Sequence, residues 1–212
     1  MPRVVVAQVR GVDDVIPTAQ TTNYHIARLL VLLLAFSPRG GTFDGLTKLA
    51  KLDFLLRYPV FLERLMDARE LAWPTGLAPD RSERWAVESH MIRYKYGPWD
   101  DRYYVLLRGL VGRGLAELVP AKRTISLRLT PEGRALADSV GATAEWSVLA
   151  ARSAFLKRHF DWTGNRLKET IYRELPDVVQ RPLRTKIAFD GSVELRSGDF
   201  EVGGGESSGE PT

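Results

Sequence analysis

The fold is decided by WDDRYYVLLRGLVGRGLAEL (Trp99–Leu118), followed by VPAKRTISLRLT (Val119–Thr130) and PEGRALA (Pro131–Ala137). Glycines at 112 and 114 are placed to end a helix, because glycine adopts the left-handed backbone that closes a last turn. Apolar residues recur before them at the spacing of one helix face; they are Leu106, Leu107, Leu110 and Val111. The first stretch therefore predicts a helix.

A β-hairpin and a second helix are expected to follow. Ala116–Val119 and Ile125–Leu129 alternate apolar and polar residues, and the polar residues 120–124 join them. Thr130 can cap the next helix with its hydroxyl, and Pro131 suits the first helical position because no N–H is needed there. Helix, hairpin and helix in this order indicate the second half of a winged helix.

The register over residues 99–137 resembles the pattern LxxLxxxGLxxL…LTxxG of MarR-like and PadR-like winged-helix proteins. That resemblance concerns the fold more than the function. We expect an α+β, mostly helical protein with a winged-helix core, N-terminal helices, a C-terminal helical extension and a C-terminal β-hairpin.

Composition confines the class of protein. The chain has 212 residues, of which 44% are hydrophobic and 26% charged, as in ordinary globular domains. It has no cysteine, which excludes disulfides, thiolate catalysis and zinc sites built on cysteine. Leu29–Phe36, the most apolar run, is too short to span a bilayer, and the N-terminus does not resemble a signal peptide. A cytoplasmic protein is expected, and a net charge of +4 permits nucleic-acid binding without arguing strongly for it.

Upstream of the deciding stretch, the pattern predicts three helices and then irregular chain. Thr21, Thr22 or Asn23 can cap the first helix, which runs to about Phe36, and Pro59 should end the second. The expected elements are helices from 43–45 to about 58 and over 60–71, a loop over 73–84, and a strand or irregular segment over 85–96.

Four segments describe the expected domain organisation. They are an N-terminal extension over 1–19 that includes a possible strand at 4–9, a winged-helix core over 20–140, C-terminal helices and a hairpin over 141–202, and a disordered tail over 203–212. The helices are expected at 131–140, 143–160 and 164–175. Asp190-Gly191 between alternating runs is a strong signal for the last hairpin.

No enzyme is expected, because no catalytic constellation can be assembled. The three histidines, His25, His90 and His159, lie in different segments without metal-ligand spacing, and no phosphate-binding loop is present. Asp100 and Asp101 are expected in the first turn of their helix, where the macrodipole stabilises negative charge. We expect no catalytic residue, no cofactor and no metal.

The wing is the obvious nucleic-acid element. Lys122 and Arg123 at the hairpin tip can reach phosphates, with Arg102 and Arg108 as further contacts. The alternative is a solvated, charged turn. Asp100 and Asp101 would repel a phosphate-lined groove, so sequence-specific reading of DNA by this helix is disfavoured.

Aromatic residues at the start of the helix suit a protein interface. Trp99, Tyr103 and Tyr104 belong to residue types that dominate interface hot spots. The alternative is that two of these three rings belong to the core.

The upstream segment contains a carboxylate among apolar residues. Asp53 lies in LDFLL, where it must face solvent or find a donor such as Lys48, Lys51 or Arg57. A salt-bridged solvent face is the simpler interpretation.

LTKLAKLDFLLRYPVFLERL and ESHMIRYKYGPWDDRYYVLLRGLVGRGLAEL together resemble the small middle component of bacterial three-component systems built around an SMC-like or Rad50-like ABC ATPase, which include Lamassu antiphage defence. The resemblance covers about residues 20 to 140. Its family-like positions are Lys51, Asp53, Arg57, Pro59, Tyr94, Tyr96, Gly97, Pro98 and Asp101.

This resemblance implies a non-enzymatic winged-helix adaptor that bridges the ATPase and a nuclease-like effector, and it leaves open a third contact with double-stranded DNA. The residues expected to bind partners are Trp99, Tyr103, Tyr104, Asp101, Tyr96 and Arg57. A free-standing DNA-binding transcriptional regulator or antitoxin is the alternative, and the basic wing supports it.

Overall fold

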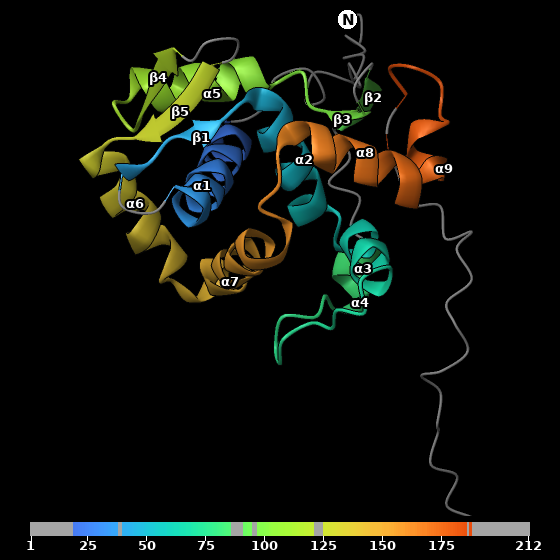
Figure 1. Cartoon of the computed structure of the whole chain (residues 1–212). Coiled ribbons are helices and arrows are strands. Elements are labelled where there is room, and N and C mark those ends of the chain that lie inside the picture. Colours follow the sequence, from blue (N-terminus) through green and yellow to red (C-terminus); the bar gives the residue numbers. More distant parts are fainter. Residues whose placement is uncertain are drawn as a thin grey trace, which may run out of the picture.

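The computed structural model describes residues 19–37, 40–85, 91–94, 97–120, 125–185 and 187. The fold is α+β and mostly helical, with two small antiparallel sheets (Figure 1). In chain order the elements are α1 (Ala19–Phe36), β1 (Phe43–Asp44), α2 (Leu46–Arg57), α3 (Pro59–Asp67), α4 (Arg81–Trp85), β2 (Ile92–Tyr94), β3 (Gly97–Trp99), α5 (Tyr103–Gly112), β4 (Ala116–Pro120), β5 (Ile125–Leu129), α6 (Pro131–Gly141), α7 (Ala144–Phe160), α8 (Gly164–Glu174) and α9 (Pro176–Val179).

Helix α1 forms the centre of the core. It packs against α5, α6 and α7, and β5 also contacts it. The apolar run predicted to be a core helix supplies fully buried side chains, namely Leu29, Leu30, Leu32 and Leu33. Gly109 of α5 permits a close approach, because a Cβ there would lie 2.9 Å from Ile26 Cδ1 of α1.

The larger sheet has the order β1-β5-β4. Phe43 of β1 pairs with Leu127 of β5, and Ala116 of β4 pairs with Leu129 at the other edge. The predicted hairpin is confirmed, and so is its exit: the Thr130 hydroxyl accepts a hydrogen bond from the Gly133 N–H at 3.0 Å. Local turn chemistry therefore determines this part of the chain.

The prediction of a helix beginning at Trp99 is wrong. Residues 97–99 form β3, which pairs with β2, and α5 begins only at Tyr103. The Asp100 side chain accepts a hydrogen bond from the Arg102 N–H at 2.9 Å, and its carbonyl accepts one from the Tyr103 N–H. Asp100 thus makes a turn before the helix, and neither aspartate lies within its first turn.

Two other elements differ from the sequence-based prediction, one because of strand pairing and one because of a helix cap. Phe43 and Asp44 were expected at a helix start but form β1, since they pair with β5. The expected 73–84 loop includes the start of α4, where Asp80 and Glu83 each accept a hydrogen bond from the other's backbone N–H. The expected strand at 4–9, most of the C-terminal hairpin and the tail at 203–212 lie outside the described residues.

Within the described ranges, no helix combines the length and the apolar character needed to cross a bilayer.

Leu107 tests the contribution of α5 to the core. Its side chain is buried, so Leu107→Ala should lower the free energy of unfolding by roughly 2–5 kcal/mol through lost burial and a residual cavity. Val105→Ala is the matched control, because Val105 lies on the same helix but is 59% exposed. Urea unfolding should show a change within about 0.5 kcal/mol for that control. Equal losses in both variants would contradict the assignment of the inner face.

Candidate functional site

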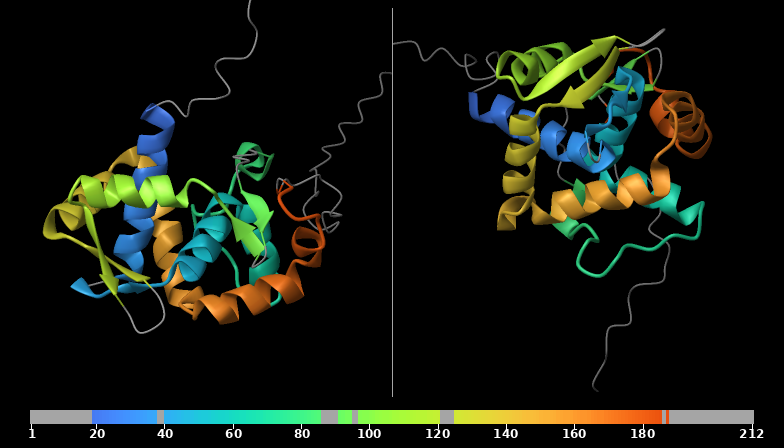
Figure 2. Two further views of the ribbon diagram at one scale, coloured as in Figure 1. Left: turned by 90° about the horizontal axis from the view of Figure 1, so that it is seen from above. Right: turned by 60° about the vertical axis from the view of Figure 1, so that its left-hand side comes forward.

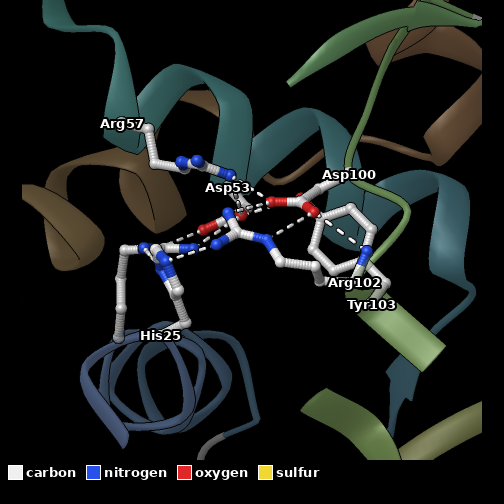
Figure 3. Close-up of polar contacts among 7 residues, drawn as sticks. His25, Asp53, Arg57, Asp100, Arg102 and Tyr103 are labelled. Atoms are coloured by element: carbon white, nitrogen blue, oxygen red, sulfur yellow. Dashed lines mark hydrogen bonds and ion pairs between the residues drawn. The ribbon is translucent and has the colours of Figure 1, made fainter. Parts of the chain in front are cut away.

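Seven polar side chains meet where α1, α2 and the start of α5 converge (Figure 3). We call this set the buried charge network; its members are His25 and Arg28 of α1, Asp53 and Arg57 of α2, and Asp100, Arg102 and Tyr103 at the start of α5. All but Arg102 are buried.

Asp53 is the fully buried centre of the network. Arg28 donates to both carboxylate oxygens, at 2.7 and 3.2 Å, and the Tyr103 hydroxyl donates at 2.7 Å. Arg57 Nη1 lies 3.8 Å from the same carboxylate. Burial alone would raise the pKa of Asp53, but Arg28 and Arg57 outweigh it and hold the pKa below its ordinary value. The carboxylate is therefore ionised.

Asp100 is the second carboxylate of the network. It accepts from Arg57 Nη1 at 2.8 Å and from Arg102 Nε and Nη2 at 3.0 and 2.8 Å. Burial acts to raise its pKa, but the bonds from Arg102 and the charge of Arg57 keep that pKa well below its usual range. Pairing with Arg57 and Arg102 thus stabilises the negative charge of Asp100, whereas we expected the helix macrodipole to do so.

His25 lies between two guanidinium groups. Its Nδ1 is 2.5 Å from Arg28 Nη1, and its Nε2 is 2.9 Å from Arg102 Nη1. Burial and the charge of Arg28 lower the pKa of His25 to about 3, so the ring is neutral at physiological pH. Three arginines then face two carboxylates, which leaves the network with one excess positive charge.

The network fixes the position of α5. It connects residues of three segments that are 25 to 77 positions apart in sequence. Charges that are buried and paired with one another in this way orient helices but are closed to a substrate. We therefore assign the network to holding α5 in place.

Outside the buried charge network, Lys51 forms a further polar contact, which joins α2 to the sheet β2-β3. Its buried amine donates to the Pro98 carbonyl at 3.0 Å, and Gly97, with φ +93°, lies over its side chain. Burial, with the nearby charge of Lys168, lowers the pKa of Lys51 to about 7. The two sequence stretches on which the resemblance to the ATPase subunit rests therefore contact each other inside the molecule. Lys51 bonds to Pro98, and Arg57 bonds to Asp100.

Burial removes two residues from the predicted partner-binding set. Tyr103 is 1% exposed and donates to Asp53, and Arg57 is bonded to Asp100, so neither can dock a partner. The interpretation of Asp53 as part of a solvent face is also wrong, because its principal partner is the buried Arg28.

The other predicted partner residues remain near the surface or lie outside the structure. Trp99 is half-buried and packs edge-on against Tyr103, whereas Asp101 and Tyr104 are exposed. Tyr96 is outside the described residues.

The four predicted DNA contacts also differ in where the structure places them. Lys122 and Arg123 lie outside the described residues. Arg102 is half-buried and committed to Asp100 and His25, which removes it from the expected phosphate contacts. Arg108 is exposed on α5.

The exposed side of α5 is mostly apolar. We call it the α5 outer face; it consists of Tyr104, Val105, Arg108, Val111 and Gly112. Tyr104 and Val105 are 56% and 59% exposed, and Val111, whose spacing we assigned to the same helix face as Leu107 and Leu110, is 38% exposed. Of these residues, Tyr104 belongs to a type that is enriched at interface hot spots.

Sequence reasoning missed Arg28 and His25. Their signal was a charge placed directly before the most apolar run of the chain, three residues after a histidine, which puts both on one side of a helix. In the part of the chain that the structure describes, no group of three or more histidines and carboxylates could hold a metal ion.

No family model, curated protein or solved structure matches the chain.

Asp53→Asn tests the network. Loss of the central charge leaves the buried Arg28 without its carboxylate partner and removes one of the two carboxylates near Arg57, so the free energy of unfolding should fall by roughly 3–5 kcal/mol. Asp101→Asn removes the same charge from an exposed neighbour of the network and should change it by less than about 0.5 kcal/mol. A small loss from Asp53→Asn in chemical denaturation would contradict the central role.

Lys51 predicts a specific pH dependence. Its pKa is about 7 in the folded chain and 10.5 ordinarily, so between these values the unfolded chain binds more protons and stability rises with pH. From pH 7 to 9 the gain from Lys51 should be about 2 kcal/mol. Lys51→Met keeps the apolar stem and removes this gain. Urea unfolding at both pH values measures it, and equal pH dependence in the two proteins would refute the assignment.

Proposed function

We propose that this protein is a winged-helix subunit that acts as a non-catalytic adaptor in a complex built around an SMC-like or Rad50-like ABC ATPase, of the kind found in Lamassu antiphage defence. In this proposal the α5 outer face binds the ATPase or the nuclease-like effector. The observation that carries it is the division of α5 into a charged, internally bonded start and an exposed apolar face.

The element order supports a winged-helix core. Helices α1, α2 and α5 with strands β1, β4 and β5 follow the order of that fold, and the sheet order β1-β5-β4 agrees with a hairpin wing paired to a short strand after the first helix. Residues 58–99, which contain α3, α4 and the sheet β2-β3, are an insertion between the second and third helices of this core.

The chemistry of α5 favours protein over DNA as the ligand of this helix. A helix that reads a major groove presents donors and acceptors to base edges. Here Asp100 and Arg102 are bonded to each other and to the network, and Arg108 is the exposed cation among apolar neighbours. Tyr104 and Val105 gain roughly 25 cal/mol per Å² when a partner covers them.

The assignment to an ATPase complex rests on the sequence resemblance. Its motif residues Lys51, Asp53 and Arg57 act within the fold, so they support a shared architecture and do not identify the partner. The partner must be identified by experiment.

A double variant of the α5 outer face tests the proposal. Tyr104→Ala with Val105→Ala should release the ATPase or effector when the tagged full chain is purified from native cells and its partners are identified by mass spectrometry. Because both residues are more than half exposed, the melting temperature should change little.

Leu136→Ala with Val148→Ala is the matched control, since these exposed apolar residues lie on α6 and α7. The control should retain the partner. If the α5 variant retains the ATPase, the interface does not lie on the α5 outer face. Purification without an ATPase, together with a footprint on one operator at physiological salt, would favour the free-standing regulator.

A further inference from the structure

The connection between α7 and α8 gathers positive charge on aromatic rings. Four cations from four parts of the chain surround Asp161 and Trp162. We call them the junction cations; they are Lys48 of α2, Arg69 after α3, Lys157 of α7 and Arg166 of α8.

Two of these cations stack on the same indole. The Arg69 and Arg166 guanidinium carbons lie 4.7 and 4.3 Å from the Trp162 ring centre. Arg69 also donates to the His159 carbonyl at 2.6 Å. A guanidinium held over a ring can still donate N–H groups to an anion and has lost part of its conformational entropy already.

The other two cations share one carboxylate. Lys48 and Lys157 both donate to Asp161, and each ammonium lies about 5.5 Å from the Phe36 ring centre. The exposed Asp161 cancels one of these four positive charges, so the junction cations keep an excess of positive charge. The exposed Arg158, at the end of α7, adds a further cation.

Helix electrostatics do not account for Arg166. Lys157 and Arg158 are stabilised by the negative C-terminal end of α7. Arg166, by contrast, lies in the first turn of α8, where the helix dipole is itself positive and where Thr163 already caps its N–H. A cation placed against that dipole increases the attraction of the surface for an anion.

We propose that the α7–α8 junction binds the phosphodiester backbone of a nucleic acid without reading its sequence. The planar fork of a guanidinium group matches the geometry of phosphate oxygens, and phosphate contacts require no base recognition. In both views of Figure 2 the chain turns between α7 and α8 at the periphery of the molecule, so the junction lies at the surface. The site is distinct from the α5 outer face and does not rest on the proposed adaptor function.

Fluorescence anisotropy with a labelled mixed-sequence duplex tests this site on the full chain. Arg69→Gln with Arg166→Gln should weaken binding roughly tenfold and reduce the slope of log K against log salt by roughly two, because two phosphate contacts are lost. Arg108→Gln with Arg128→Gln removes the same charge from α5 and β5, and should change both quantities by less than half as much. Melting temperatures show that each variant is folded.

Duplex DNA and duplex RNA probes distinguish the two sources of phosphodiester, and tight binding of either supports the proposal. Three results would overturn it: no binding of the wild type at about 50 mM salt, equal or larger losses in the Arg108 and Arg128 control, or binding of a labelled poly-glutamate peptide as tight as that of the duplex. The last result would assign the junction to an acidic protein.

Discussion

The pairing of Asp53 with Arg28 is the interaction on which the arrangement of helices depends. A carboxylate with no exposed surface is tolerable only when charged donors surround it, and here they come from α1 and α2, with the Tyr103 hydroxyl from α5. A helix that shifted would leave at least one charge buried without its partner. The network therefore selects one relative position of the three helices, at a cost in desolvation that apolar packing around it offsets.

The same network gives α5 its two different sides. Its start is drawn inward because Asp100 binds Arg57 and Arg102, and the inner side buries Tyr103 and Leu107. What remains outside is the α5 outer face, which no described element covers. The polar groups at the start of α5 thus bond inside the molecule, and the α5 outer face is left mostly apolar.

The sequence predicted the parts of the fold that local chemistry controls. The β4-β5 hairpin, the Thr130 cap and the inward face of α5 each depend on residues a few positions apart. The network could not be predicted in this way, because Asp53 and Arg28 are 25 residues apart and the sequence offered closer donors. Tyr103 was misplaced for a related reason: an aromatic beside Asp100 fits a surface or a core equally well until the partner of its hydroxyl is known.

The contact between Arg57 and Asp100 has a further consequence for how such a chain can vary. Arg57 ends α2, Asp100 follows β3, and their side chains are 2.8 Å apart. Residues 58–99 therefore begin and end at one point of the fold, although Phe61, Leu65 and Met91 within them belong to the core. Within this segment, the exposed residues 74–76 can change in number at a small entropic cost while the helices around Asp53 keep their geometry, which makes them the natural place for an insertion.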